Sequence, residues 1–474
     1  MNKKRIAWTA AVCVFAAGAG LLAAHVHPVR PKTKYVFLFI GDGMGNGVTK
    51  AAEKLLDHRP SFQEFPVTGF MDTDNVYGEV TDSAAAITAM ICGHKTKNGR
   101  IGMDREGTTG WESAAILLEE AGWAVGVLST APLNHATPAG FYAEAKDRAE
   151  YDSLAGQAIR SDFLDVLGGG GFLLEDMESA ALLEEAGKRG WIIVDAAEIL
   201  DEGEAEETGD GEMPDEAEEP GTGDMPAETD ADDGPMLVTC EGEYSAPFME
   251  YEIDRLRMEE YGTETVSLAD ITREAIGILE KKERFFLAAE SAMIDSALHQ
   301  GDLASAVYEV AALEDAVAEA VEFYRRHPEE TLIIVLADHE TGGVTLPAGY
   351  DLAPLETQRA SWSRVDGYIR ELLEENADEQ EFLDMIDHYL GLGSSGTLLL
   401  EEEEKELLEA YRAGEKSEIR DALFAILQKK ADISFSTDGH TAGPVTVYAF
   451  GNGQQEFSGC FDNTEIFRIL SELQ

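Results

Sequence analysis

Residues 35–43 read YVFLFIGDG, a continuous apolar run that ends abruptly in glycines around one carboxylate, Asp42. A run of this kind is typical of a strand that is buried on both faces of a parallel sheet. In open sheets of this type, functional groups collect beyond the carboxyl ends of the strands. The stretch therefore predicts a central parallel strand that carries an acid to the functional edge of the sheet.

Segments further along the chain repeat this pattern in alternation with helix-like segments. We expect strands at residues 67–71, 124–129, 163–167, 191–194, 284–289, 331–337 and 446–450. We expect helices at residues 83–92, 112–121, 182–189, 267–280, 315–326 and 463–473, a polar loop at 134–139, and a polar helix after it that carries Arg148. This alternation predicts an α/β fold with a central, mainly parallel sheet flanked by helices on both faces.

The composition limits the classes of partner. The chain has 474 residues, 44% of them hydrophobic, and a formal net charge of -56. So large a negative charge argues against nucleic-acid binding, because a phosphate backbone is bound by Lys and Arg. Beyond residue 27 the cysteines are Cys92, Cys240 and Cys460, an odd number, so we do not expect a disulfide framework.

The N-terminus has the features of an export signal. Basic residues at positions 3–5 precede an apolar stretch at residues 6–24 that contains small residues suited to cleavage. We interpret residues 1–27 as a signal peptide or an uncleaved N-terminal anchor, which would then be the only contact with a membrane. Either interpretation predicts an exported protein that is periplasmic, extracellular or membrane-anchored on the outer side.

Two segments differ from the rest of the chain. Residues 201–235 contain sixteen acidic residues and no Lys or Arg. They cannot bury enough apolar surface to offset chain entropy, so we expect an acidic disordered loop. A calcium-binding repeat is the alternative, although no fixed ligand spacing is present. Residues 346–430 are mostly charged and helix-patterned, which predicts a helical insertion whose charge run at 401–405 lies on a solvated helix face.

Three carboxylates, Asp42, Glu290 and Asp338, follow directly on apolar runs. If those runs are neighbouring parallel strands, the three side chains meet at one edge of the sheet. A cluster of buried carboxylates is costly unless positive charge compensates it. Divalent metal ions are the simplest source of that charge.

Histidines lie beside acids in the same regions. Asp295 and His299 are four residues apart, so on a helix they share a face and can bind one ion. His339 directly follows Asp338, and His440 lies in a glycine-flanked loop. Carboxylate and imidazole ligands together favour zinc or a similar ion.

A candidate nucleophile lies in the stretch TDSAA, residues 81–85. Ser83 is flanked by an acid and followed by small helix-forming residues, so its hydroxyl would lie at a helix N-terminus. The helix dipole and the free N–H groups favour an anion there. We expect Ser83 to attack phosphoryl groups with the help of metal ions, and the alternative is that it merely caps the helix.

Several motifs together resemble the alkaline phosphatase family. They occur in the family's order and approximate spacing from about residue 35 to the C-terminus, apart from the acidic loop and much of the helical insertion. The motifs are DGMG at 42–45, TDSAA at 81–85, ATPA at 136–139, DVLGGG at 165–170, SLAD at 267–270, FFL at 285–287 with Glu290, Asp295 with His299, ADHETGG at 337–343 and GHT at 439–441. The resemblance implies that residues 28–474 form an alkaline-phosphatase-like catalytic domain.

The resemblance also implies roles for the residues that match these motifs. Ser83 would be the nucleophile that forms a phosphoserine. The ligands implied for the zinc ion that activates it are Asp42, Asp338 and His339. The ligands implied for a second zinc ion, which stabilises the leaving oxygen and then supplies the attacking hydroxide, are Asp295, His299 and His440.

A third ion and a phosphate clamp are implied in the same way. Asp42, Thr137 and Glu290 resemble the ligands of a third ion, usually magnesium, and Arg148 aligns with the bidentate phosphate clamp. His135 stands where some members carry aspartate. Because imidazole suits zinc or cobalt better than magnesium, the third site could take Zn²⁺ or Co²⁺ instead of Mg²⁺.

The function that we expect is hydrolysis of small phosphate monoesters, and the resemblance implies a homodimer, as is usual in the family. One alternative is that the same scaffold acts on a phosphodiester, a sulfate or a phosphonate. The other is an acidic cation-binding protein whose catalytic site has decayed.

Overall fold

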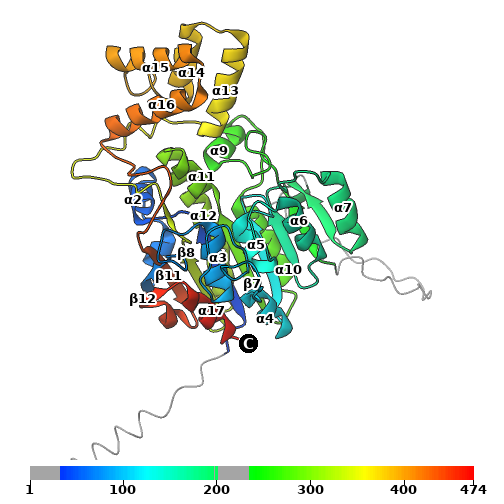
Figure 1. Ribbon diagram of the computed structural model, residues 1–474. Coiled ribbons are helices and arrows are strands. Elements are labelled where there is room, and N and C mark those ends of the chain that lie inside the picture. Colours follow the sequence, from blue (N-terminus) through cyan, green and yellow to red (C-terminus); the bar gives the residue numbers. More distant parts are fainter. Residues whose placement is uncertain (1–31, 197, 201–233) are drawn as a thin grey trace, which may run out of the picture.

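The computed structural model describes residues 32–196, 198–200 and 234–474, and its centre is a ten-stranded sheet (Figure 1). The strand order is β12-β2-β11-β8-β1-β7-β3-β4-β6-β5. Strand β1 (Tyr35–Gly41) lies between β8 (Thr331–Leu336) and β7 (Phe285–Ser291) and is parallel to both. Of the strands paired in this sheet, β11 (Val445–Gly451) alone runs antiparallel to its neighbours. The expected α/β fold with a mainly parallel sheet is confirmed.

The other strands complete the sheet and form one small ribbon beside it. They are β2 (Val67–Asp72), β3 (Ala124–Ser129), β4 (Val166–Gly169), β5 (Ile192–Asp195), β6 (Met236–Thr239) and β12 (Gly459–Asp462) in the sheet, and β9 (Glu340–Thr341) with β10 (His440–Thr441) in the ribbon.

Helices cover both faces of the sheet, as expected. Helices α10 (Leu268–Leu279) and α12 (Leu303–Arg326) pack on one face, and α2 (Asn46–Leu55) packs on α12. The other face carries α3 (Ser83–Cys92), α4 (Ala114–Glu120), α5 (Ala136–Tyr142) and α17 (Thr464–Ser471). The remaining helices of the main body are α6 (Tyr151–Arg160), α7 (Ser179–Lys188), α9 (Glu252–Glu260) and α11 (Met293–His299).

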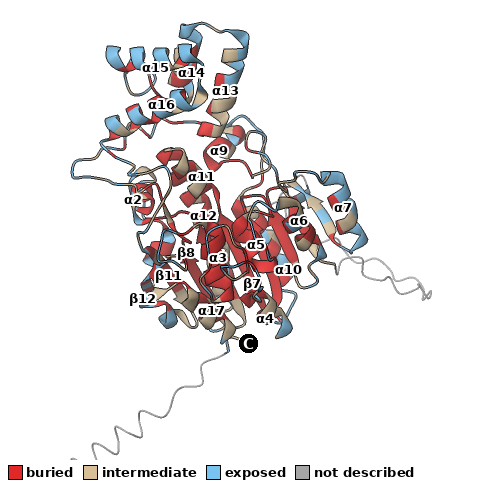
Figure 2. Cartoon of the chain, in the orientation of Figure 1, coloured by how far each residue is buried: buried red, intermediate tan, exposed pale blue. Residues whose placement is uncertain are grey.

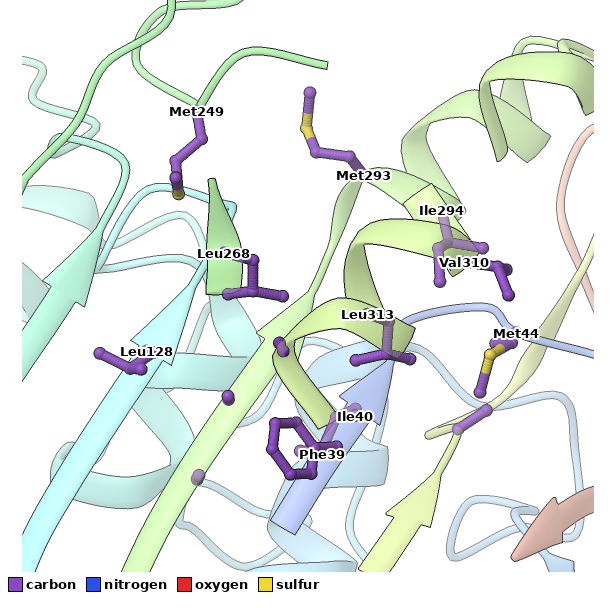
Figure 3. Packing of buried hydrophobic residues seen from close by; sticks show 14 of the residues in the cluster. Phe39, Ile40, Met44, Leu128, Met249, Leu268, Met293, Ile294, Val310 and Leu313 are labelled. Atoms are coloured by element: carbon purple, nitrogen blue, oxygen red, sulfur yellow. The ribbon is translucent and has the colours of Figure 1, made fainter. Parts of the chain in front are cut away.

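The core forms because β1 is apolar on both of its faces. Residues 36–40 are at most 1% exposed, and buried residues fill the sheet and the inward sides of its helices (Figure 2). The ring of Phe37 lies 5.5 Å from that of Phe323 on α12, measured between centroids. Figure 3 shows Phe39 and Ile40 of β1 in this core together with Leu313 of α12. Burial on both faces holds the carboxyl end of β1 in a fixed position.

Four helices stand apart from the sheet (Figure 1). They are α13 (Trp362–Glu375), α14 (Glu379–Leu390), α15 (Glu401–Ala413) and α16 (Lys416–Ala431). The helical character expected of residues 346–430 is confirmed. Most of the charge run at 401–405 is exposed, but Glu403 is buried and pairs with Lys429 and Lys430 of α16.

Several local expectations are wrong. Residues 136–139 are not a loop but the start of α5, since a proline is tolerated in the first turn of a helix. Arg148 lies between α5 and α6 rather than on a helix, because its backbone N–H donates to the carbonyl of Gly99. Helix α12 begins at residue 303 instead of 315, because Asp302 caps it there.

Some expectations concern parts of the chain that the structure does not describe. Residues 1–27 and almost all of the acidic segment 201–235 lie outside the described residues. Within the described ranges, no helix combines the length and apolar character needed to cross a membrane. Cys92, Cys240 and Cys460 are free thiols, in agreement with the expectation of no disulfide framework.

Candidate active site

Three carboxylates converge at the carboxyl edge of the three central strands. In the register of the sheet, Ile40 lies opposite Glu290 on β7 and opposite Leu336 on β8. Asp42 directly follows β1, and Asp338 follows β8 after Ala337, so both side chains lie at the same edge of the sheet as Glu290. All three carboxylates are at most 2% exposed. The convergence expected from the apolar runs is confirmed.

The first group of potential metal ligands is Asp42, Asp338 and His339. The Nε2 atom of His339 lies 3.4 Å from Oδ1 of Asp42 and 3.3 Å from Oδ2 of Asp338. The Oγ atom of Ser83 lies 3.2 Å from the same Nε2. The ligand atoms of the three residues lie within 4.8 Å of one another, so one ion could contact them all. This arrangement places a hydroxyl directly beside a candidate metal site.

The second group contains Asp295 and His299 on α11, and His440 on β10. Nε2 of His299 lies 3.2 Å from Oδ2 of Asp295 and 3.1 Å from Nε2 of His440. The Nδ1 atoms donate to backbone carbonyls: that of His299 to Asp438 and that of His440 to Thr81, the latter at 2.8 Å. With their protons on Nδ1, the two neutral rings would direct lone pairs at each other. A shared cation satisfies both of them.

Protonation of His299 replaces that cation in metal-free protein. The Asp295 carboxylate raises the pKa of His299 to about 9, chiefly through the hydrogen bond between them. The charged imidazolium can then donate to the carboxylate. A proton on His299 can therefore satisfy this group in place of a metal ion.

The third group combines Asp42 and Glu290 with His135 at the start of α5. Nε2 of His135 accepts a hydrogen bond of 2.9 Å from Nη2 of Arg148, and burial together with the Arg148 charge lowers the pKa of His135 to about 3. Thr137 is also fully buried, and its Oγ1 has no hydrogen-bond partner in the described part of the chain. The structure therefore brings His135, which stands where some family members carry aspartate, directly to this group.

The electrostatics of these groups call for cations. Burial, reinforced by the neighbouring acids, raises the pKa of Asp338 to about 8 and that of Asp42 well above its ordinary value. Burial likewise raises the pKa of Glu290 to about 7. Several polar atoms here are buried without a hydrogen-bond partner among the described residues: Oδ1 of Asp42, Oδ2 of Asp338, Oε1 of Glu290, Nδ1 of His135 and Oγ1 of Thr137. Oxygen and nitrogen donors without partners fit hard and borderline divalent metals.

Ser83 does not cap its helix. The cap of α3 is Asp82, whose Oδ1 accepts from the N–H of Ala85 at 2.9 Å. Oδ2 of Asp82 accepts from Nη1 of Arg148 at 3.3 Å. Ser83 is 2% exposed, and its hydroxyl contacts His339 instead. The alternative that Ser83 serves merely as a helix cap is therefore wrong.

Residues 33–172 and 241–474 match the family model for alkaline phosphatase. The chain belongs to the alkaline phosphatase family. Among curated relatives, it is 29% identical to alkaline phosphatase 3 of Bacillus subtilis over 466 residues, which cover 94% of this chain and 90% of that protein. It is 28% identical to the human tissue-nonspecific isozyme over 364 residues, with 68% of this chain and 67% of that protein covered.

Solved structures agree with this assignment. The crystal structure of a cold-active alkaline phosphatase from Shewanella sp. superposes with a TM-score of 0.75 at 26% identity, covering 92% of this chain and 99% of that one. The alkaline phosphatase of Thermus thermophilus shares the fold, with a TM-score of 0.73 at 23% identity. This chain is therefore a metal-dependent enzyme with an alkaline phosphatase fold. The matched range 241–474 includes residues 346–430, a helical segment much of which we expected to lie outside the resemblance.

Two residues of this alkaline phosphatase site were not identified from the sequence. Asp82 holds Arg148, and its position just before a helix is typical of an N-cap. Thr341 of β9 donates a hydrogen bond to Oδ1 of Asp295, and its Oγ1 lies 3.3 Å from Nδ1 of His339. Thr341 therefore links the first and second groups. No local pattern indicates this, because Asp295 is 46 residues away in the chain.

Proposed function

We propose that this enzyme hydrolyses phosphate monoesters through a phosphoserine at Ser83, with two Zn²⁺ ions and a third cation. The observation that carries the proposal is the 3.2 Å separation between the Ser83 hydroxyl and Nε2 of His339. Nε2 of His339 lies in turn 3.3–3.4 Å from Asp338 and Asp42. The serine lies at the rim of a group able to hold a metal ion.

Each cation has its own residues in this proposal. Asp42, Asp338 and His339 would hold the zinc ion beside Ser83, and Asp295, His299 and His440 would hold the second zinc ion. Asp42, Glu290, Thr137 and His135 would hold the third cation. The ions would supply Lewis acidity, which lowers the pKa of the attacking hydroxyl and neutralises the leaving oxygen.

The side chains of the protein bind and orient the phosphoryl group. Arg148 presents a planar guanidinium that can donate two parallel hydrogen bonds to phosphate oxygens. Asp82 fixes one edge of that guanidinium through Nη1. The N-terminus of α3, where Ser83 is the first residue, adds the favourable end of the helix dipole.

The reaction then has two displacements. Ser83 Oγ gives up its proton to solvent and bonds to phosphorus, and the bond to the alcohol oxygen breaks. The leaving oxygen takes up a proton from solvent and departs as the alcohol. Water then attacks the phosphoserine, which releases inorganic phosphate and restores the hydroxyl. Two in-line displacements retain the configuration at phosphorus, so a chiral phosphate ester should give retention.

The third cation differs from the usual magnesium in this proposal. Magnesium prefers oxygen ligands, whereas His135 offers nitrogen. Zinc or cobalt should therefore bind there as well as or better than magnesium. Elemental analysis of purified protein, followed by titration of metal-stripped protein with each ion, measures this preference.

A turnover assay with an aryl phosphate tests the function. Ser83→Ala should reduce turnover to the background of the assay, while Ser458→Ala, which removes an exposed hydroxyl outside the site, should not change it. A panel containing a phosphodiester, a sulfate ester and a phosphonate decides between the expected monoesterase and an enzyme of another specificity. Full turnover by Ser83→Ala would contradict the mechanism, and metal binding without turnover of any ester would indicate a decayed site.

We also propose that the enzyme is exported through residues 1–27, that any membrane contact is made by that segment, and that the enzyme forms a homodimer. The basic and apolar pattern of the segment and the family's usual assembly support these proposals. Cell fractionation with N-terminal sequencing tests the first two. Light scattering of the purified protein tests the third.

A further inference from the structure

The side chain of His135 lies between a cation of the protein and a candidate cation site. Its Nε2 accepts a hydrogen bond from Nη2 of Arg148 at 2.9 Å, and its Nδ1 is buried with no partner in the described ranges. One ring nitrogen also lies within 4.8 Å of carboxylate oxygens of Asp42 and Glu290. The ring therefore faces the guanidinium of Arg148 on one side and the carboxylates of the candidate cation site on the other.

The number of lone pairs on the His135 ring limits how many hydrogen-bond donors and cations it can bind. A guanidinium can only donate hydrogen bonds, so the Nε2 atom that faces Arg148 must offer a lone pair. A neutral imidazole has one lone pair and one N–H in the ring plane. The contact with Arg148 therefore uses the only lone pair that His135 has, and the remaining nitrogen, Nδ1, carries the proton.

A cation at the third site conflicts with this arrangement whichever nitrogen it contacts. If it contacts Nε2, it takes the lone pair that Arg148 uses. If it contacts Nδ1, the proton must move to Nε2, which then faces the guanidinium as a second donor. In both cases the hydrogen bond between His135 and Arg148 is lost.

We propose that Arg148 and the third-site cation compete for His135, so that binding of the cation frees Nη2 of Arg148 to bind phosphate. The proposal rests on the proposed function, in which Arg148 holds the phosphoryl group. The contact of Nη1 with Asp82 at 3.3 Å does not involve His135, so the guanidinium keeps one anchor when the other is released. The third cation thereby acts on phosphate binding through the protein.

Thermodynamic reciprocity gives the proposal a measurable form. If the cation increases the affinity for phosphate by some factor, phosphate increases the affinity for the cation by the same factor. The coupling is set by one hydrogen bond that involves a charged group, which corresponds to about tenfold or more in affinity. Simple attraction between cation and phosphate adds to this and must be separated from it.

Calorimetry on full-length protein loaded with only two Zn²⁺ per chain, with the third site shown by elemental analysis to be free, measures the coupling. Mg²⁺, and separately Co²⁺, is titrated into the protein with and without saturating inorganic phosphate. We expect phosphate to lower the Kd of the third-site cation by about tenfold or more, and the cation to lower the Kd of phosphate equally. Absence of any such coupling in the wild-type protein would overturn the proposal without any variant being needed.

A neutral variant separates competition from simple attraction. In His135→Gln the side-chain oxygen has two lone pairs and can accept from Arg148 while it binds the cation. The effect of phosphate on the cation should therefore shrink in His135→Gln to the part due to charge attraction. An undiminished effect in a folded His135→Gln protein would show that attraction accounts for all of it, and would overturn the proposal.

Two arginine variants complete the comparison. Arg148→Met should bind the third cation more tightly without phosphate, and its coupling should shrink to the part due to charge attraction. Arg105→Met removes the same charge from an arginine that pairs with exposed Glu106, and it should behave as wild type. These titrations use resting protein, so turnover is measured separately. Coupling without turnover would refute the proposed function alone, and turnover without coupling would refute the competition alone.

Discussion

Removal of the metal ions should make the folded protein lose stability as the pH rises from about 4.5 to 8. Glu290 is 2% exposed, and burial raises its pKa from 4.5 to about 7. In the unfolded chain the same carboxyl ionises near 4.5, so between these values the folded state holds a proton that the unfolded state has released. Stability is therefore lost as the pH rises, and this rise in pKa corresponds to about 3 kcal/mol.

Two other groups, Asp338 and His299, act in the same direction. The pKa of Asp338, raised to about 8, gives a further loss over this range. His299, with its pKa raised to about 9, stabilises the folded state below pH 6.5 and loses that contribution as the pH rises. Two histidines act against this direction, because burial lowers the pKa of His135 to about 3 and that of His339 well below its ordinary value. Their unfolded forms bind protons below pH 6.5 that the folded forms do not, so these two groups add stability as the pH rises to 6.5. The pKa of Asp295 is lowered, so its contribution disappears only in acid, below the range considered.

Urea unfolding at pH 5, 6, 7 and 8 with a chelator measures the effect. The free energy of unfolding of metal-free protein should show a net fall of about 3 kcal/mol across the series, because the losses at Glu290, Asp338 and His299 exceed the gains at His135 and His339. Zinc and magnesium should abolish the fall, because the cations replace the protons. Metal-free Glu290→Gln should lose about 3 kcal/mol less than the wild type, since an amide does not titrate. Constant or rising stability of the metal-free protein would refute the reasoning.

Three further changes follow from the contacts of the site. Thr341→Val removes the hydroxyl that contacts Asp295 and His339, so zinc affinity should fall about 10–100-fold, and Thr341→Ser should restore it. Competition with a chelating dye measures the affinity. Equal affinity of the valine variant and the wild type would exclude the link through Thr341. Gly43→Ala should lower the free energy of unfolding by about 1–3 kcal/mol, because φ of residue 43 is +68° and the new Cβ would lie 2.7 Å from Oγ1 of Thr341. An unchanged midpoint of urea unfolding would contradict this expectation. Asp302→Ala removes a buried carboxylate that accepts four hydrogen bonds. Thermal unfolding should show that the free energy of unfolding falls by about 3–5 kcal/mol, with an intermediate loss in Asp302→Asn. An alanine variant as stable as the wild type would refute the stabilising role of this carboxylate.

The architecture could be predicted wherever burial governs the sequence pattern. Strands β1, β7 and β8 are apolar along their length because both of their faces are covered, and that pattern is visible in one dimension. Strand β12 has an exposed edge and only four residues, so it left no comparable pattern. The start of α12 was misplaced because Asp302, its cap, lies next to glycine in a stretch that resembles a turn.

Those residues of the candidate site that belong to local sequence patterns could be predicted. Carboxylates at strand ends are a local pattern, and the structure brings those residues together with histidines. Asp295 and His299, four residues apart, also form a local pattern, and their side chains are in contact. Contacts between distant segments left no trace in the sequence. The hydrogen bond between Arg148 and His135 depends on a loop between α5 and α6, and the position of Thr341 depends on pairing between β9 and β10.

Rapid acid quenching of the enzyme during turnover of an aryl phosphate tests the central claim most directly. Peptide mapping by mass spectrometry then locates any covalent phosphate. We expect phosphate on the peptide that contains Ser83, and none on the same peptide from Ser83→Ala. Continued turnover with no phosphate on Ser83 would show that water attacks the ester directly, and would contradict the account.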